Sequence, residues 1–258
     1  MKENLKVALV QFNQVWEDKQ ANFKFLDKLI QESVLTPTDL IIFPEMFHTG
    51  FSMNPSGLAE TMDGEGIQWL KEKAKEYSAA TVASVIIKEG KKFVNRGVFI
   101  EPNGIIHQYD KRKLFSLSRE NNYFEAGNQP LIIEYKGWKI RLQICYDLRF
   151  PEMAENKVEN GKFWYDLLIN IANWPQKRIF HWKTLLQARA IENQVFVIGV
   201  NRVGKNNKGL YYSGDSAIIN PDGTTIQSCS DQETVINDEL DYSILESTRN
   251  LLPFLNDR

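Results

Sequence analysis

Short apolar runs typical of buried strands alternate along this chain with segments whose apolar residues recur at helical spacing. The first expected strands, 7–12 and 40–43, are separated by an expected helix. Its apolar face consists of Phe23, Leu26, Ile30 and Val34. Strands that alternate with helices are typical of layered α/β folds with parallel sheets. The alternation therefore predicts an α/β protein.

The pattern continues towards the carboxyl terminus. We expect further helices around 67–77 and 185–191 and further strands at 82–87, 167–172 and 195–200. Two hairpins are expected, at 94–109 and 216–227, because each contains Pro-Asn-Gly or Pro-Asp-Gly between apolar runs. A strand pair is expected at 131–145, turning near Gly137. The two hairpins indicate two sheets of related organisation, and the lack of a linker predicts one domain, residues 1–258.

Composition narrows the class of protein. The 258 residues are 43% hydrophobic and 25% charged, an ordinary globular balance. The net charge of −2 gives no positive field to attract nucleic acid or an anionic membrane. No apolar run approaches the roughly 18 residues that span a bilayer, and the amino terminus lacks the apolar core of a signal peptide. We expect a cytoplasmic protein with no nucleic-acid or membrane partner.

The segment 142–152 takes an apolar strand pattern into Cys145 and then into a charged turn. Side chains at the carboxyl ends of strands project into a crevice in open α/β sheets, which would make this thiol available for chemistry. Free cysteines are also among the most often buried residues, so this segment alone leaves packing and catalysis open. Cys229 lies in a polar segment without acid or base neighbours and is expected to be structural. Two cysteines form no disulfide framework, and a reducing compartment suits a working thiol.

Two other segments deliver charged residues to strand ends. Pro44 stops the strand 40–43 just before Glu45, and Lys111 follows the second strand of the first hairpin. Taken singly, each residue is more typical of a solvated surface. Together with Cys145 they match the needs of amide hydrolysis through a thiol: a base, an oxyanion donor and an acid for the departing amine. A lysine beside the thiol also lowers its pKa from the free value of about 8.5.

The sequences FPEMF, DKRKLF and ICYDLRFPE around these three residues resemble the Glu-Lys-Cys signature of the nitrilase superfamily of carbon–nitrogen hydrolases. The resemblance continues through Asn173-Trp174-Pro175, His181-Trp182, residues 188–194 and Gly214-Asp215-Ser216. It is strongest for the omega-amidase branch. The resemblance implies a four-layer α-β-β-α sandwich, which pairs through a helical layer into a homodimer or a larger assembly. It also implies hydrolysis of the terminal amide of 2-oxo acid amides, such as 2-oxoglutaramate and 2-oxosuccinamate, through a thioester.

By this resemblance, Cys145 would be the nucleophile and Glu45 the general base. Lys111 and the backbone N–H of Tyr146 would hold the oxyanion. Members of the family carry a second glutamate between the lysine and the cysteine. Glu120 falls where relatives place it, whereas Glu125 lies in the same loop and remains an alternative.

Arg149 is a candidate for binding a substrate carboxylate, because a guanidinium can pair with a carboxylate in a bidentate manner. Its alternative is an internal ion pair with Asp147 or Glu152. Aromatic residues near the expected site are candidates for the wall of a small pocket, although such residues are more often core. They are Phe47, Phe115, Tyr146 and Trp174, with the segment 51–53 beside them.

The sequence also bears on metal-dependent, cofactor-dependent and inactive alternatives. Metal-dependent hydrolysis is disfavoured because His48, His107 and His181 are far apart in sequence and no cluster has ligand spacing, so we expect no metal. No Gly-rich phosphate loop is present, so no organic cofactor is expected. Hydrolysis of another small amide, an N-carbamoyl compound or a nitrile remains open, as does an inactive scaffold that retains the fold.

Overall fold

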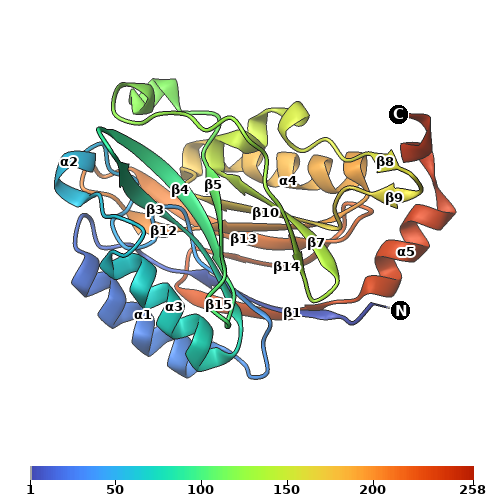
Figure 1. Ribbon diagram of the computed structural model, residues 1–258, viewed down its shortest axis with the longest axis horizontal. Coiled ribbons are helices and arrows are strands. Elements are labelled where there is room, and N and C mark those ends of the chain that lie inside the picture. The colour runs from blue at the N-terminus through green and yellow to red at the C-terminus, as the bar shows by residue number, and fades with distance from the viewer. Residues whose placement is uncertain (1) are drawn as a thin grey trace.

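The computed structural model describes residues 2–258 as two packed sheets with helices on their outer faces (Figure 1). The first sheet has the strand order β15-β1-β2-β3-β4-β5. Its strands are β1 (Leu5–Gln11), β2 (Leu40–Ile42), β3 (Ala80–Glu89), β4 (Lys92–Ile100), β5 (Ile106–Asp110) and β15 (Thr234–Leu240).

The second sheet has the order β12-β13-β11-β10-β7-β6, with β14 paired to β13. Its strands are β6 (Ile132–Tyr135), β7 (Trp138–Ile144), β10 (Leu167–Ala172), β11 (Phe196–Asn201), β12 (Val203–Lys205), β13 (Tyr211–Ile219) and β14 (Thr225–Ser230). A small separate ribbon pairs β8 (Val158–Glu159) with β9 (Lys162–Phe163). The α-helices are α1 (Lys19–Ser33), α2 (Pro55–Leu58), α3 (Glu65–Tyr77), α4 (Ile179–Asn193) and α5 (Tyr242–Leu251).

The two sheets share one organisation, as the two hairpins predicted. In the first sheet β1, β2 and β3 are parallel, and β4 and β5 continue it antiparallel. In the second, β7, β10 and β11 are parallel, and β13 and β14 continue it antiparallel. An antiparallel strand flanks each parallel set: β15 beside β1 and β6 beside β7. The carboxyl ends of the parallel strands therefore form one edge in each sheet.

Three apolar clusters hold four layers together. One lies between the sheets and joins side chains such as Leu9 and Ile42 to Leu142 and Ile169. A second packs α1 and α3 onto the first sheet, and a third packs α4 onto the second. Figure 1 shows α1 and α3 against one sheet and α4 against the other. The expected α-β-β-α sandwich is confirmed. The helix face expected from Phe23, Leu26 and Ile30 is buried in α1, with Val34 buried at its C-cap, and the helix expected around 67–77 is α3.

Two elements near the carboxyl terminus were not predicted. β15 follows the last expected hairpin, and α5 begins directly after its cap residue Asp241. In β15 only Ile236 and Leu240 are buried, because it covers the open edge of β1. An edge strand with so few buried positions shows little of the apolar pattern on which sequence prediction relies. No helix within residues 2–258 is long and apolar enough to cross a bilayer.

Candidate active site

The predicted acid, amine and thiol come together where strands of both sheets end. Glu45 lies just beyond β2, Lys111 just beyond β5, and Cys145 just beyond β7. Asn173 follows β10, the neighbour of β7, and completes the group. Because the carboxyl ends of the parallel strands meet at this edge, residues far apart in sequence become neighbours.

A buried charge cluster forms the base of the site. Nζ of Lys111 lies 2.8 Å from Oε1 of Glu45 and 3.0 Å from each carboxylate oxygen of Glu120. All three side chains are fully buried. Glu120 also accepts a hydrogen bond from the backbone N–H of Phe115. Glu125, the alternative second glutamate, is exposed and lies 3.5 Å from Lys92, so the structure brings Glu120 to the lysine.

Asn95 on β4 connects these charged groups and was missed in the sequence. Its Nδ2 donates to Oε1 of Glu45 at 2.9 Å and lies 3.5 Å from Oε1 of Glu120. Its backbone carbonyl accepts from the backbone N–H of Lys111 at 2.9 Å. The only signal in the sequence is a short polar amide in a strand that also carries several apolar residues, where a buried polar group needs a partner.

Asn173 contacts both Glu45 and the thiol. The backbone N–H of Asn173 donates to Oε2 of Glu45 at 3.0 Å, and its side-chain amide donates to the Glu45 backbone carbonyl. The backbone carbonyl of Asn173 lies 3.9 Å from Sγ of Cys145. Glu45 is thus held by Lys111 and Asn95 on one oxygen and by Asn173 on the other. Its position is fixed on both sides.

The turn that carries Cys145 is tightly held. Cys145 begins the 3₁₀ helix η3 (Cys145–Arg149) with a positive φ of 46°. Asp147, two residues on, is fully buried and accepts from the N–H of Ile144, the hydroxyl of Tyr109 and the N–H of Lys113. Asp147 therefore ties the turn with the thiol to the segment with Lys111. The sequence offered Asp147 only as a partner for Arg149, and that pairing is absent from the described residues.

Burial dominates the ionisation of the site. Burial and the charge of Glu45 raise the pKa of the Cys145 thiol well above its ordinary value, although Lys111 lowers it. The lowering effect expected of the lysine is present, but desolvation and the charge of Glu45 outweigh it. Burial also raises the pKa of Glu45, against the lowering effect of Lys111. Burial lowers the pKa of Lys111, but the charges of Glu120 and Glu45 raise it by more than burial lowers it. The lysine therefore stays charged.

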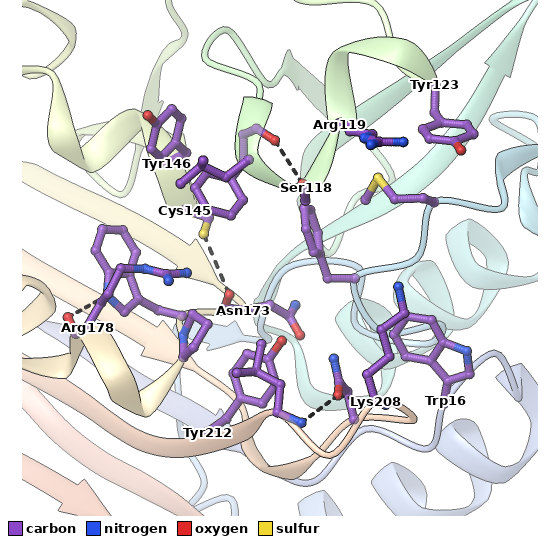
Figure 2. A pocket seen from close by; sticks show the side chains of 18 of the residues that line it. Trp16, Ser118, Arg119, Tyr123, Cys145, Tyr146, Asn173, Arg178, Lys208 and Tyr212 are labelled. Atoms are coloured by element: carbon purple, nitrogen blue, oxygen red, sulfur yellow. Dashed lines mark hydrogen bonds between the residues drawn. The ribbon is translucent and has the colours of Figure 1, made fainter.

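A cavity of about 500 Å³ opens above Cys145 (Figure 2). Phe115, Tyr146 and Trp174 line it as predicted, and Phe51 and Met53 join them. Glu45, Lys111 and Glu120 are not among the lining residues, so the thiol is the reacting group that faces the cavity while the charges lie beneath it.

Some aromatic and polar candidates lie elsewhere. Phe47 is fully buried against Phe43 and Trp69 and belongs to the core. Ser52 is buried and donates to Glu17. Cys229 is partly buried beside the core between the sheets. Among residues 2–258, no three His, Cys, Asp or Glu side chains are grouped in a way that could hold a metal ion.

Arg149 lies in the wall of the cavity. Its Cζ is 4.5 Å from the centre of the Trp174 ring, and its Nη1 is 3.3 Å from Nδ1 of His181. Within residues 2–258 it forms no ion pair with either expected acid: Asp147 is satisfied internally, and Glu152 lies 3.5 Å from Lys113. The guanidinium is therefore available to a ligand.

Comparisons with known proteins agree with this geometry. Residues 6–250 match the carbon-nitrogen hydrolase family. The chain is 40% identical to the omega-amidase YafV of Escherichia coli strain K12 over 98% of this chain and 96% of that protein. It is 33% identical to the 2-oxoglutaramate amidase of Bacillus subtilis over 97% of this chain and 96% of that protein.

Solved structures agree as well. The CN-hydrolase superfamily protein XC1258 of Xanthomonas campestris superposes with a TM-score of 0.96 at 37% identity, covering 99% of this chain and 97% of that one. Nit3 of Saccharomyces cerevisiae, a member of the nitrilase superfamily, gives 0.86 at 26% identity, covering 97% and 95%. The buried Glu-Lys-Glu cluster, the thiol above it and these similarities place the chain in the carbon–nitrogen hydrolase family of the nitrilase superfamily, as a hydrolase of carbon–nitrogen bonds.

Proposed function

We propose that this hydrolase is an omega-amidase that converts the terminal amides of 2-oxoglutaramate and 2-oxosuccinamate to the acids and ammonia. One observation carries the proposal: the cavity above Cys145 is lined by cationic side chains and by no acidic one. The cationic side chains are Arg119, Arg149, Arg178 and Lys208. Such a cavity favours a small amide that carries a carboxylate. The names of the similar amidases point to the same substrate class.

The first chemical step needs a proton acceptor next to the thiol. The raised pKa of Cys145 means that the thiol enters the reaction protonated. In the proposed mechanism, Glu45 takes this proton as Sγ attacks the amide carbonyl carbon. The contacts from Asn95, Lys111 and Asn173 keep the carboxylate in place for that transfer.

The tetrahedral intermediate carries a negative charge on oxygen. An ammonium has three N–H donors, and before the reaction Lys111 directs them to Glu45 and to the two oxygens of Glu120. In the proposed mechanism the donor on Glu45 turns to the oxyanion once Glu45 has taken the thiol proton and lost its charge. We assign Lys111 and the backbone N–H of Tyr146 to the oxyanion, because Tyr146 lies in the first turn of η3 where backbone donors lack helical acceptors. Glu120 then keeps the lysine charged and positioned.

Collapse of the intermediate releases the amine. Glu45 returns its proton to the departing nitrogen, which leaves as ammonia, and the acyl group remains on Sγ as a thioester. Glu45 next takes a proton from water as the water oxygen attacks the thioester carbonyl. The carbon–sulfur bond breaks, the proton returns to sulfur, and the acid leaves. One carboxylate therefore serves as base and acid in both halves.

The proposed role of Glu45 sets the pH dependence. Because burial and the charge of Glu120 raise the pKa of Glu45, kcat/KM of the wild type should fall on the acidic side with a midpoint above pH 4.5. Glu120→Gln removes the negative charge that raises the pKa of Glu45, so the midpoint of the pH profile should move to lower pH. The same substitution should decrease kcat. Glu125→Gln, on an exposed glutamate of the same loop, is the control and should move neither. A midpoint that stays in place or rises in Glu120→Gln would contradict this assignment.

The function itself is tested by ammonia release from a substrate panel. The panel is 2-oxoglutaramate, 2-oxosuccinamate, glutamine, asparagine, a simple nitrile and an N-carbamoyl amino acid, each with wild type and Cys145→Ala. We expect preference for the two oxo amides and complete loss in Cys145→Ala. If another panel member is preferred, the proposed chemistry stands and the proposed substrate is replaced by that compound. Turnover of none would favour an inactive scaffold.

We also propose, from the family resemblance, a homodimer or larger assembly in the cytoplasm, built from one carbon–nitrogen hydrolase domain, residues 1–258. Cys145 and Cys229 are both free thiols in the described structure, which fits a reducing compartment.

A further inference from the structure

Two arginines from different turns converge around Trp174 in the cavity wall. Arg149 ends η3, the turn that carries the thiol, and its Cζ lies 4.5 Å from the Trp174 ring centre. Arg178 ends the 3₁₀ helix η5 (Gln176–Arg178), and its carbonyl accepts from the indole N–H of Trp174 at 2.8 Å. Trp174 therefore holds one arginine on its face and the other by its backbone. Figure 2 shows Arg178 on the same side of the cavity as Cys145, across from Trp16 and Lys208.

The two guanidinium groups belong to the lining of one cavity, and neither is neutralised by an acid. Arg178 lies with its Cζ 5.3 Å from the Phe115 ring centre, and both arginines are half-buried. Burial lowers the pKa of Arg149, and the positive charge of Arg178 lowers it further. Among residues 2–258, no carboxylate lies within 4.0 Å of either guanidinium. Two partly desolvated like charges without a counterion are unfavourable, so an anion that contacts both guanidinium groups relieves this penalty.

We propose that Arg149 and Arg178 form a two-arginine clasp that binds the 2-oxo acid end of the substrate and excludes 2-amino acids. This inference deepens the proposed function and rests on it for the identity of the amide. No motif in the sequence pointed to Arg178. It is a specificity-determining residue, distinct from the groups that act on the amide.

The chemistry of the clasp explains the choice between an oxo and an amino group. A 2-oxo acid presents two carboxylate oxygens and a neighbouring carbonyl oxygen, all acceptors, to two donor-only guanidinium groups. Glutamine places an ammonium at the same carbon, where it would face two positive charges. No acidic side chain lines the cavity to pair with that ammonium. The clasp thus attracts one end of the oxo acid and repels the corresponding end of the amino acid.

The clasp is tested by calorimetric binding to Cys145→Ala, which leaves the ligands intact. The ligands are 2-oxoglutaramate, glutaramate, which lacks the oxo group, and glutamine. We expect them to bind with decreasing affinity in that order. Adding Arg178→Gln should weaken binding of 2-oxoglutaramate by about tenfold or more and narrow its advantage over glutamine. Lys177→Gln, on an exposed cation of the same turn, is the matched control and should leave all three affinities unchanged.

Kinetics in the background that retains Cys145 separates binding from chemistry. Arg178→Gln should raise KM for 2-oxoglutaramate with kcat nearly unchanged, and Arg178→Lys should recover only part of the loss, because an ammonium lacks the guanidinium fork. An unchanged KM in Arg178→Gln, or an equal loss of affinity for oxo and amino ligands, would overturn the clasp.

Failure of the proposed function can be told apart from failure of the clasp. The pair 2-oxobutyrate and 2-aminobutyrate carries no amide, so its binding to wild type and Arg178→Gln is independent of which amide is hydrolysed. Arg178-dependent preference for 2-oxobutyrate in a protein that does not hydrolyse oxo amides would support the clasp and reject the substrate assignment. No preference between the two would reject the clasp, whatever the amidase activity.

Discussion

Replacing Lys111 with methionine should reduce amide hydrolysis by about a thousandfold and destabilise the fold by about 3–5 kcal/mol. The ammonium is a buried partner of two carboxylates, and its removal leaves Glu45 and Glu120 charged, buried and close together. The loss of activity and the loss of stability both follow from the contacts of Lys111 with Glu45 and Glu120. The measurements are kcat/KM for the preferred amide and urea unfolding followed by circular dichroism.

The pH dependence of that stability identifies its cause. Without the lysine, burial and the charge of Glu120 hold the pKa of Glu45 in the folded state above its value in the unfolded state. The folded variant then binds more protons, so its deficit relative to wild type should shrink as the pH falls from about 8 to about 5. Lys92→Met is the control, because it breaks only the exposed pair with Glu125 and should cost less than about 1 kcal/mol. A deficit that is independent of pH would point to lost packing and contradict the electrostatic account.

Replacing Glu45 with glutamine should abolish amide hydrolysis while making the thiol easier to ionise. The amide of the new side chain is nearly isosteric with the carboxylate, but it has a single accepting oxygen, so only one of the contacts from Asn95 and Asn173 retains its acceptor. An amide can neither accept the thiol proton nor protonate the departing nitrogen. The charge of Glu45 is one of the causes that raise the pKa of Cys145, and its removal leaves the thiol with less negative charge nearby.

Alkylation resolved by residue separates these two effects. The rate of iodoacetamide modification of Cys145 should reach its midpoint at lower pH in Glu45→Gln than in wild type, and Cys229 in the same sample is the internal reference. Loss of hydrolysis together with a lowered alkylation midpoint identifies Glu45 as the proton carrier. If the midpoint rises, or if hydrolysis persists within about tenfold of wild type, Glu45 is not that group.

Sequence reasoning was most successful where local pattern and chemistry coincide. Glu45, Lys111 and Cys145 each follow an apolar strand pattern, and the strand ends meet in space because the strands belong to two sheets with the same organisation. The helices α1 and α3 were found for a similar reason, since their buried faces repeat at helical spacing. Periodicity can reveal such features without any knowledge of neighbouring strands.

What the sequence did not reveal depends on partners distant in the chain. Asn95 gains its place only when β4 pairs with β5 and brings its amide to Glu45, 50 residues away. In the sequence, Arg178 is one cation in a polar turn. Its place in the cavity wall depends on its contacts with Trp174 and Phe115. The lysine that lowers the pKa of Cys145 can be predicted from the sequence, but the burial that raises this pKa further than the lysine lowers it cannot. Tertiary contacts, rather than local propensity, decide these three features.

The positive φ of Cys145 also affects the outcome of selecting variants of this protein for thermal stability. Cys145 and Met46, which follows Glu45, both have φ of 46°, a left-handed backbone that costs an L-residue about 1–2 kcal/mol relative to the right-handed form. Glycine adopts it without that penalty. A screen that rewards heat resistance alone would therefore favour glycine at position 145 and discard the nucleophile, whereas Met46 is fully buried in an apolar cluster and the loss of its contacts opposes the same change. The same backbone that presents the thiol keeps this enzyme below the thermal stability its fold could reach, and only a screen that also demands turnover would preserve it.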